Sequence, residues 1–460
     1  MDGAGMREVA TTWVGATAKQ IARAVRRGDA TATQVVADHL EQIAISDPTL
    51  HAFRVIRSGE AIVEAEKVDE QEDLANLPLA GVPVVVKENT PVAGLPVWHG
   101  SAAARRPIAE NDHEVVRRLR GAGAVVVGIT RMPEMGLWAV TDDGEVATRN
   151  PWNLDRTPGG SSGGSGAAVA AGLVPIAQGN DGLGSLRIPA ACCGLVALKP
   201  GRGVVPAELG IDNWFGLVEN GVLATTVADA ALGFNVLAGR RPATLVEPGR
   251  LRIGVSLRSP VSGLRPDQPN RSAVATAAKL LVSAGHDTIT ADPPYPAWLP
   301  MLGSAMWVAA AYREAEAAGY DLAALQPRTR QHVRLGKIAW RRGWVRLDQR
   351  DRWRERSLRF FADERIDLLL TPALSTAPPP SEGYAGAPWR RSVVTSVRSG
   401  AYLGQWNLAG LPALVVPVGT RPDGLPLAVQ FVGPPDSELR LLAIAGQLER
   451  ANPWQRLALV

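Results

Sequence analysis

The feature that most constrains the fold is a stretch rich in glycine, serine and alanine at residues 157–189. It reads TPGGSSGGSGAAVAAGLVPIAQGNDGLGSLRIP, and five glycines stand among residues 159–166. Glycine permits positive φ and lets other backbone or a ligand come close. A flexible linker can have this composition, but here the glycines run directly into an Ala/Val segment and an apolar run. We therefore interpret the stretch as a set of turns inside a packed core.

The second half of this stretch places a serine at the start of a predicted helix. The loop NDGLGS at 180–185 precedes a helix expected over Leu186–Cys193, and Pro189 is tolerated in the first turn of a helix. Backbone N–H groups around Ser185 would stabilise an anion, as an acyl-transfer oxyanion requires. A plain serine N-cap would look the same. The loop alone does not decide between the two.

Lysine is rare in this chain, which makes the position of one lysine informative. Only six of the 49 basic residues are lysine, and Lys87 directly follows the apolar run 82–86. Ligand sites in open α/β sheets favour the carboxyl ends of strands. A buried lysine can lose its proton, whereas an arginine cannot. Lys87 is therefore a candidate base, although a lysine that lies along apolar surface for structural reasons remains an alternative.

The wider pattern predicts an α/β fold. Strands are expected at 81–86, 124–128, Ala413–Val418 and Leu427–Val432. Helices are expected within 17–50 with a break at Gly28, and at Glu114–Gly121, 222–239 and Glu438–Arg450. Because strand-like runs occur near both ends of the 460 residues, one sheet that contains both is the most economical arrangement. Residues 251–400 are less regular and rich in Trp, Arg and Pro.

Composition indicates in which cellular compartment the protein is expected and which classes of partner it is expected to bind. Residues 1–20 lack a secretory pattern, no apolar run reaches about 18 residues, and the two cysteines are adjacent, so we expect a cytoplasmic protein. Residues 328–359 hold twelve Arg or Lys against three acids. Such a basic segment can bind nucleic acid or a membrane surface. We prefer a solvated helical face with Trp340, Trp344 and Trp353 on its buried side, and thus no nucleic-acid or membrane partner.

Five motifs in this order resemble the amidase signature family. They are GVPVVVKEN at 81–89, TRNPW at 148–152, GGSSGGSGAAVAAG at 159–172, GNDGLGSLRIPAACCGLVALKP at 179–200 and NLAGLPALVVPVGTRPDGLPLAVQFVG at 407–433. The resemblance implies one α/β/α sandwich around a large mixed sheet, over 1–460, with a homodimer as a common assembly. Within it we expect N-terminal helices (1–75), a signature core (76–250), a variable substrate-pocket region (251–400), and C-terminal strands and a helix that return to the core (401–460).

The same resemblance assigns roles to the polar residues of these motifs. It implies that Ser185 is the nucleophile, that Ser161 follows a cis peptide bond and relays protons, and that Lys87 is the neutral base. The substrate would be a small-molecule amide, and no cofactor or metal is implied. Supporting roles are implied for Ser162 and for an ion pair between Asp181 and Arg187, and the oxyanion hole would comprise the N–H groups of Gly182, Leu183, Gly184 and Ser185.

Leu183 is the clear departure from the family pattern, Glu88 in place of the more usual Asp is a lesser one, and other functions compete with the amidase interpretation. Leu183 stands where the family usually has glycine, so it either narrows the acyl site or changes the dihedrals of the loop. The G-x-S-x-G at 159–163 lacks the preceding strand of an α/β-hydrolase elbow. The six histidines lack a clear orienting motif, and no phosphate-binding G-x-x-x-x-G-K-[ST] occurs. An amidase-like subunit of a glutamine-dependent amidotransferase and a non-catalytic binding protein of the same fold remain alternatives.

Overall fold

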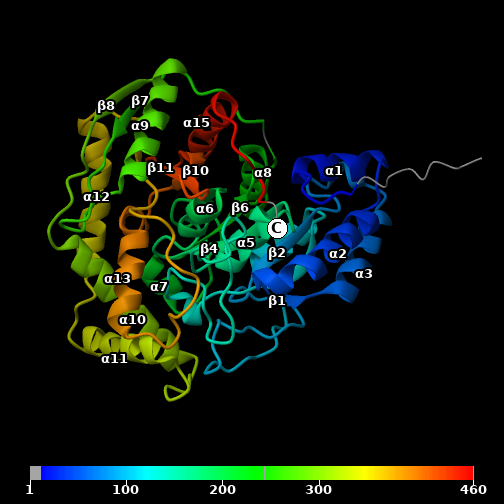
Figure 1. Cartoon of the computed structure of the whole chain (residues 1–460), viewed down its shortest axis with the longest axis horizontal. Helices are drawn as coiled ribbons and strands as arrows, with labels where there is room; N and C mark the ends of the chain where they lie inside the picture. The colour runs from blue at the N-terminus through cyan, green and yellow to red at the C-terminus, as the bar shows by residue number, and fades with distance from the viewer. Residues whose placement is uncertain (1–11, 243, 459–460) are drawn as a thin grey trace, which may run out of the picture.

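The computed structural model describes residues 12–242 and 244–458, and its centre is one mixed sheet of eleven strands (Figure 1). The order of the strands across the sheet is β1-β3-β2-β4-β6-β5-β10-β11-β9-β7-β8. The strands are β1 (Phe53–Ile56), β2 (Pro83–Lys87), β3 (Val125–Thr130), β4 (Ile176–Asp181), β5 (Val196–Lys199), β6 (Glu219–Ala224), β7 (Arg252–Val255), β8 (Asp287–Thr290), β9 (Leu368–Pro372), β10 (Ala413–Thr420) and β11 (Pro426–Val432).

Helices flank this sheet, as the resemblance implied. They are α1 (Ala18–Arg27), α2 (Ala32–Leu50), α3 (Ser58–Asp69), α4 (Glu114–Gly121), α5 (Gly163–Ala170), α6 (Arg187–Cys193), α7 (Asp212–Gly216), α8 (Val227–Leu237), α9 (Gln268–Ser283), α10 (Leu299–Ala317), α11 (Pro327–Arg341), α12 (Leu347–Asp363), α13 (Trp389–Gly400), α14 (Gly404–Ala409) and α15 (Glu438–Ala451). Figure 1 shows α1, α2 and α3 together at one end of the molecule and α10 to α13 at the other.

The C-terminal strands lie in the middle of the sheet, beside a strand from the first half of the chain. β10 pairs antiparallel with β5, so that Ala413 lies opposite Lys199, and β11 continues the sheet on its other side. The prediction of one sheet that contains strands from both ends is therefore confirmed. The core strands carry β-branched residues that are buried on both faces, as in PVVVK of β2, which is typical of a sheet covered by helices.

Two expectations about secondary structure were wrong. The apolar run 222–239 is not one helix, because β6 extends to Ala224 and α8 begins at Val227. Thr226 caps α8 by accepting the N–H of Asp229, and an apolar run alone does not separate a buried strand from a buried helix. Residues 251–400 also hold more order than expected, since β7, β8 and β9 form one edge of the sheet. These strands have only four or five residues each, which is too short for a clear strand pattern in the sequence.

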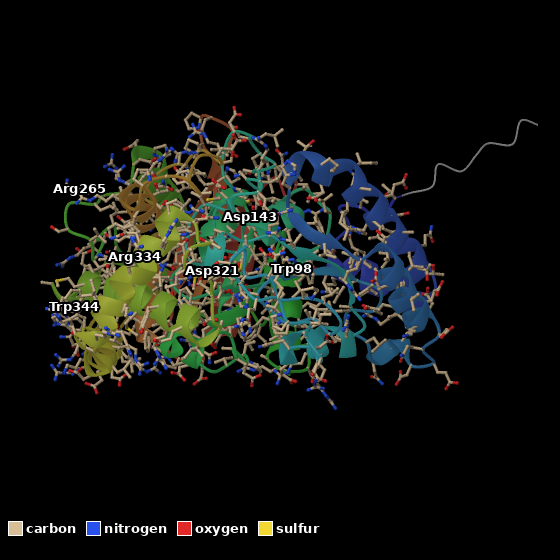
Figure 2. The ribbon with its side chains drawn as sticks, turned by 90° about the horizontal axis from the view of Figure 1, so that it is seen from below. Trp98, Asp143, Arg265, Asp321, Arg334 and Trp344 are labelled. Atoms are coloured by element: carbon tan, nitrogen blue, oxygen red, sulfur yellow. The ribbon has the colours of Figure 1, made fainter. Side chains whose placement is uncertain are left out.

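The basic segment 328–359 forms α11, α12 and the turn between them. Trp353 is fully buried and donates its Nε1–H to the carbonyl oxygen of Gln405. The expectation that all three tryptophans face inward was wrong, because Trp340 and Trp344 are 41% and 54% exposed. Figure 2 shows Trp344 at the outer edge of this flank, with Arg334 nearby on the same side. Trp340 stacks on Phe215 there, with a ring-centroid distance of 6.0 Å.

Hydropathy and helix length give one further result. In the described residues, every helix is too short or too polar to cross a membrane. The absence of a secretory pattern was inferred from residues 1–20, and residues 1–11 of that segment lie outside the part that the structure describes.

Candidate active site

The glycine-rich segment is a tightly packed turn between Pro158 and α5. The Gly160–Ser161 peptide bond is cis, as the resemblance implied. A Cβ on Gly160 would lie 2.4 Å from the carbonyl oxygen of Trp138, and one on Gly164 would lie 2.4 Å from that of Ala52. Both distances are too short for any side chain, so the backbone of two other segments occupies that space. The linker interpretation is therefore excluded.

Lys87 ends β2 inside the protein and points at this turn. Its side chain has no exposed surface, and its Nζ lies 2.7 Å from Ser161 Oγ and 2.8 Å from Asn180 Oδ1. Burial lowers the pKa of Lys87 from 10.5 to about 7, although the charges of Asp181 and Glu88 oppose that change. Near neutral pH a large fraction of this amine is unprotonated and able to accept a proton.

The loop after β4 is braced by the expected ion pair. Arg187 donates to both carboxylate oxygens of Asp181, at 2.9 and 3.0 Å, and both side chains are fully buried. Burial by itself would raise the pKa of Asp181, but the guanidinium outweighs it and holds that pKa well below its usual value. Asn407 of α14 also donates to Asp181. The carboxylate is therefore structural, since its oxygens are occupied by the loop and its neighbours.

This brace changes the set of free N–H groups in the loop. The N–H of Gly184 donates to Asp181 Oδ1 at 2.6 Å. Within the described residues, the N–H groups of Gly182, Leu183 and Ser185 have no such internal partner. The loop therefore has three free N–H donors, whereas four were expected from the sequence. The buried Ser162 contacts the start of this loop, because its hydroxyl donates to the backbone carbonyl oxygen of Asn180 at 3.2 Å.

Ser185 is half-buried just before the N-cap of α6, between two chambers. The larger chamber has a volume of about 210 Å³ and is lined almost entirely by apolar side chains and glycines, among them Trp138, Trp307 and Leu183. No Asp, Glu, Lys, Arg or His belongs to its lining. Residues of α10, α13 and α14 complete its wall. An uncharged, apolar part of a ligand fits this chamber.

The smaller chamber, of about 40 Å³, is more polar and also contains Ser161. Ser185 lines it too, so both serines face one space, yet no hydrogen bond joins their hydroxyls in the described part of the chain. The polar residues Asn89, His99, Glu314 and Tyr320 also line this chamber and were not predicted as site residues from the sequence. Asn89 stands within GVPVVVKEN beside Lys87, which was the only available signal. The other three stand outside the five motifs.

Leu183, the departure from the family pattern, lines the larger chamber. Its φ lies outside the left-handed region, whereas Gly184 beside it has φ of +124°. The side chain packs toward α14, where a Cβ on Gly404 would lie 3.3 Å from Leu183 Cδ2. Leu183 therefore occupies chamber volume without distorting the loop.

Side chains of the kinds that bind metal ions are dispersed in the described part of the chain. In residues 12–242 and 244–458, no three His, Cys, Asp or Glu side chains gather where they could hold a metal ion. Cys192 and Cys193 are fully buried in the core, and burial raises the pKa of both thiols.

The chain is also similar in sequence to known proteins. The family model described as Amidase matches residues 34–442. A Mycobacterium tuberculosis protein that is provisionally named amidase AmiB2 is 40% identical, over 94% of this chain and 95% of its own length. The 6-aminohexanoate-cyclic-dimer hydrolase of Paenarthrobacter ureafaciens is 33% identical, with 96% and 95% covered.

Solved structures show the same relationship in three dimensions. A structure of 6-aminohexanoate cyclic dimer hydrolase with substrate superposes with a TM-score of 0.85 at 31% identity, covering 96% of this chain and 98% of that one. A bacterial aryl acylamidase of the amidase signature family gives 0.81 at 26% identity, with 95% and 96% covered. The chain therefore belongs to the amidase family, as a hydrolase of carbon–nitrogen amide bonds.

Proposed function

We propose that this protein hydrolyses amides through an acyl-enzyme on Ser185, with Lys87 as the base and Ser161 as the relay between them. The observation that carries the proposal is the fully buried Lys87 amine, 2.7 Å from Ser161 Oγ, in a setting that lowers its pKa to about 7. A neutral amine at that distance can take the Ser161 proton along the existing hydrogen bond. The half-exposed Ser185 is the hydroxyl that a substrate in either chamber reaches.

The chemistry then proceeds in two halves. Lys87 takes the proton of Ser161, which takes that of Ser185, and Ser185 Oγ bonds to the carbonyl carbon. In unliganded sites such hydrogen bonds are often long and tighten only when substrate binds. The free N–H groups of Gly182, Leu183 and Ser185 hold the oxyanion. The C–N bond breaks as the proton returns through Ser161 to the amine, and water then hydrolyses the ester on Ser185.

The two chambers indicate which amides fit. The larger one has an apolar lining without charged side chains, which suits the acyl part of an amide of an apolar carboxylic acid. A charged acyl group would lose its hydration there without a partner. Leu183 limits the bulk that this chamber accepts.

Labelling with a fluorophosphonate tests the nucleophile. We expect one adduct by intact mass spectrometry, mapped to Ser185, and no adduct on a Ser185→Ala variant. That variant should also lose roughly 10⁴-fold or more in kcat on amides, because removal of a covalent nucleophile has effects of that size. Ser304→Ala is the matched control, since Ser304 also lines the larger chamber and donates only to its own helix. An adduct on another residue, or a tenth of the activity left in Ser185→Ala, contradicts the proposal.

The same experiment separates the two alternatives. A binding protein of this fold would give neither an adduct nor turnover. An amidotransferase subunit would hydrolyse amides poorly by itself and would purify with partner chains.

A further inference from the structure

The smaller chamber contains a carboxylate that the proposed mechanism does not use. Glu314 of α10 is only 8% exposed, and its Oε2 accepts the N–H of Ile211 at 2.9 Å. Gly210 makes this contact possible, because its φ is +63° and a Cβ there would lie 2.5 Å from the same oxygen. The loop before α7 is thus closed tightly around one carboxylate oxygen. The other oxygen has no hydrogen bond within the described residues.

Positive charge to balance this carboxylate is missing nearby. In the described residues, no Lys, Arg or His nitrogen lies within 4.0 Å of Glu314. His99 lines the same chamber, but burial lowers its pKa to about 4, so it is neutral. A buried carboxylate without a counter-ion is costly, and burial indeed raises the pKa of Glu314. The chamber is therefore suited to a ligand group that brings positive charge or N–H donors.

A second, independent observation is an unsatisfied hydroxyl in the same chamber. Tyr320 is 7% exposed, and its hydroxyl has no hydrogen-bond partner in the described part of the chain. Burial raises the pKa of this hydroxyl, and the carboxylates of Glu314 and Glu134 raise it further, so Tyr320 keeps its proton. Buried hydroxyls are normally satisfied. Its oxygen is an acceptor available to a ligand that occupies the chamber.

The proton relay decides which end of the substrate enters this chamber. The departing nitrogen must receive its proton from Ser161. Ser161 lines the smaller chamber and not the larger one. The amine side of the amide therefore faces Glu314 and Tyr320, while the acyl side fills the apolar chamber.

We propose that Glu314, with Tyr320, selects the leaving group: it favours ammonia or a short amine that carries a second, protonated amino group, and it rejects leaving groups that carry a carboxylate. This inference rests on the proposed function, since it assigns the two sides of the same reaction. The selection acts through charge, because an ammonium gains a buried partner and a carboxylate meets a like charge. No additional covalent step is involved.

The test uses three amides of one acid that differ only in the charge of the amine side. The acid is the one whose primary amide the wild type hydrolyses fastest in a series from acetamide to octanamide. Its N-(2-aminoethyl), N-propyl and N-carboxymethyl amides are cationic, neutral and anionic at similar size. For the wild type we expect kcat/KM to fall by tenfold or more from the cationic to the neutral amide, and again from the neutral to the anionic one.

Substitution of Glu314 should remove this discrimination. Glu314→Gln keeps an oxygen for the N–H of Ile211 and removes the charge, so the cationic-to-neutral ratio should fall at least tenfold, mainly through KM. Glu316→Gln is the matched control, because Glu316 is exposed on the same helix and should leave the ratio unchanged. Tyr320→Phe should lower the ratio several-fold and provides an independent variant if Glu314→Gln does not fold.

Failure of this inference and failure of the proposed function give different results. If Ser185 is labelled and amides are hydrolysed, but the wild type does not discriminate or both variants keep its ratio, the role of Glu314 is refuted and the acyl-enzyme stands. If the wild type hydrolyses none of the amides and Ser185 is not labelled, the proposed function itself is wrong, and the inference falls with it.

Discussion

The proton acceptor is the part of the proposed mechanism that can be tested most quantitatively. Burial lowers the pKa of Lys87 from 10.5 to about 7. At pH 8 an amine with a pKa of 7 is about nine-tenths unprotonated, whereas an ordinary lysine is unprotonated to only about 0.3%. The environment of Lys87 thus increases the reactive form roughly 300-fold. Without that burial, the same residue would be a poor base at neutral pH.

The expected pH profile follows directly. The value of kcat/KM should rise about tenfold per pH unit in acid and level off above about pH 7, without a histidine limb. Lys87→Arg should be nearly inactive, because arginine keeps its proton. The assay is initial-rate hydrolysis of one neutral amide from pH 5 to 9. Lys199→Met is the matched control, since Lys199 is also fully buried with a lowered pKa and should not affect the inflection near pH 7.

Stability supplies a second measurement of the same pKa. Because the folded-state pKa of Lys87 lies below the unfolded value, the unfolded chain binds more protons between about pH 7 and 10.5. The stability of the wild type relative to Lys87→Met should therefore rise with pH in this window, by up to about 1.4 kcal/mol per pH unit. A profile flat from pH 5 to 9, a tenth of the activity left in Lys87→Arg, or a stability difference that does not change with pH would each refute the reasoning.

Two further predictions concern the loop around Ser185. Leu183→Gly should admit bulkier acyl groups, while kcat for the best small amide stays within about tenfold of the wild type, since one hydrophobic contact is worth about 1–3 kcal/mol. If kcat instead rises equally for all acyl groups from acetyl to phenylacetyl, Leu183 does not act as part of the chamber wall. Asp181→Asn should lower the free energy of unfolding by about 3–5 kcal/mol, because it leaves the fully buried Arg187 unpaired. Asp287→Asn, which breaks an exposed pair with Arg250, should cost less than about 1 kcal/mol in the same thermal or denaturant melts. Equal effects of the two substitutions would show that Asp181 does not brace the loop.

Sequence patterns were informative where a local backbone requirement is written in consecutive residues. Gly160 and Gly164 are needed because a backbone carbonyl oxygen of another segment lies 2.4 Å from where a side chain would begin at each of them. Because lysine is scarce in this chain, Lys87 at the end of an apolar strand is conspicuous. The Asp181–Arg187 pair is also local, six residues apart on one loop and helix start. The α/β fold could therefore be predicted from the sequence, and Ser185 and Lys87 stood out as candidates, whereas the roles of Ser161, Ser185 and Lys87 were implied only by the family resemblance.

Tertiary structure alone decided the chemical environment of these residues. The pKa of Lys87 is low because segments that are distant in the sequence bury its amine completely. The loop around Ser185 has three free N–H groups because the carboxylate of Asp181 accepts the N–H of Gly184. Glu314 and Tyr320 reach the chamber from a region without a recognisable motif, because α10 and its following turn are brought there by packing. Neighbouring residues in the sequence determine the local conformation of the backbone. The charge and shape of a pocket depend on side chains that are distant in the sequence and that come together only in the folded chain.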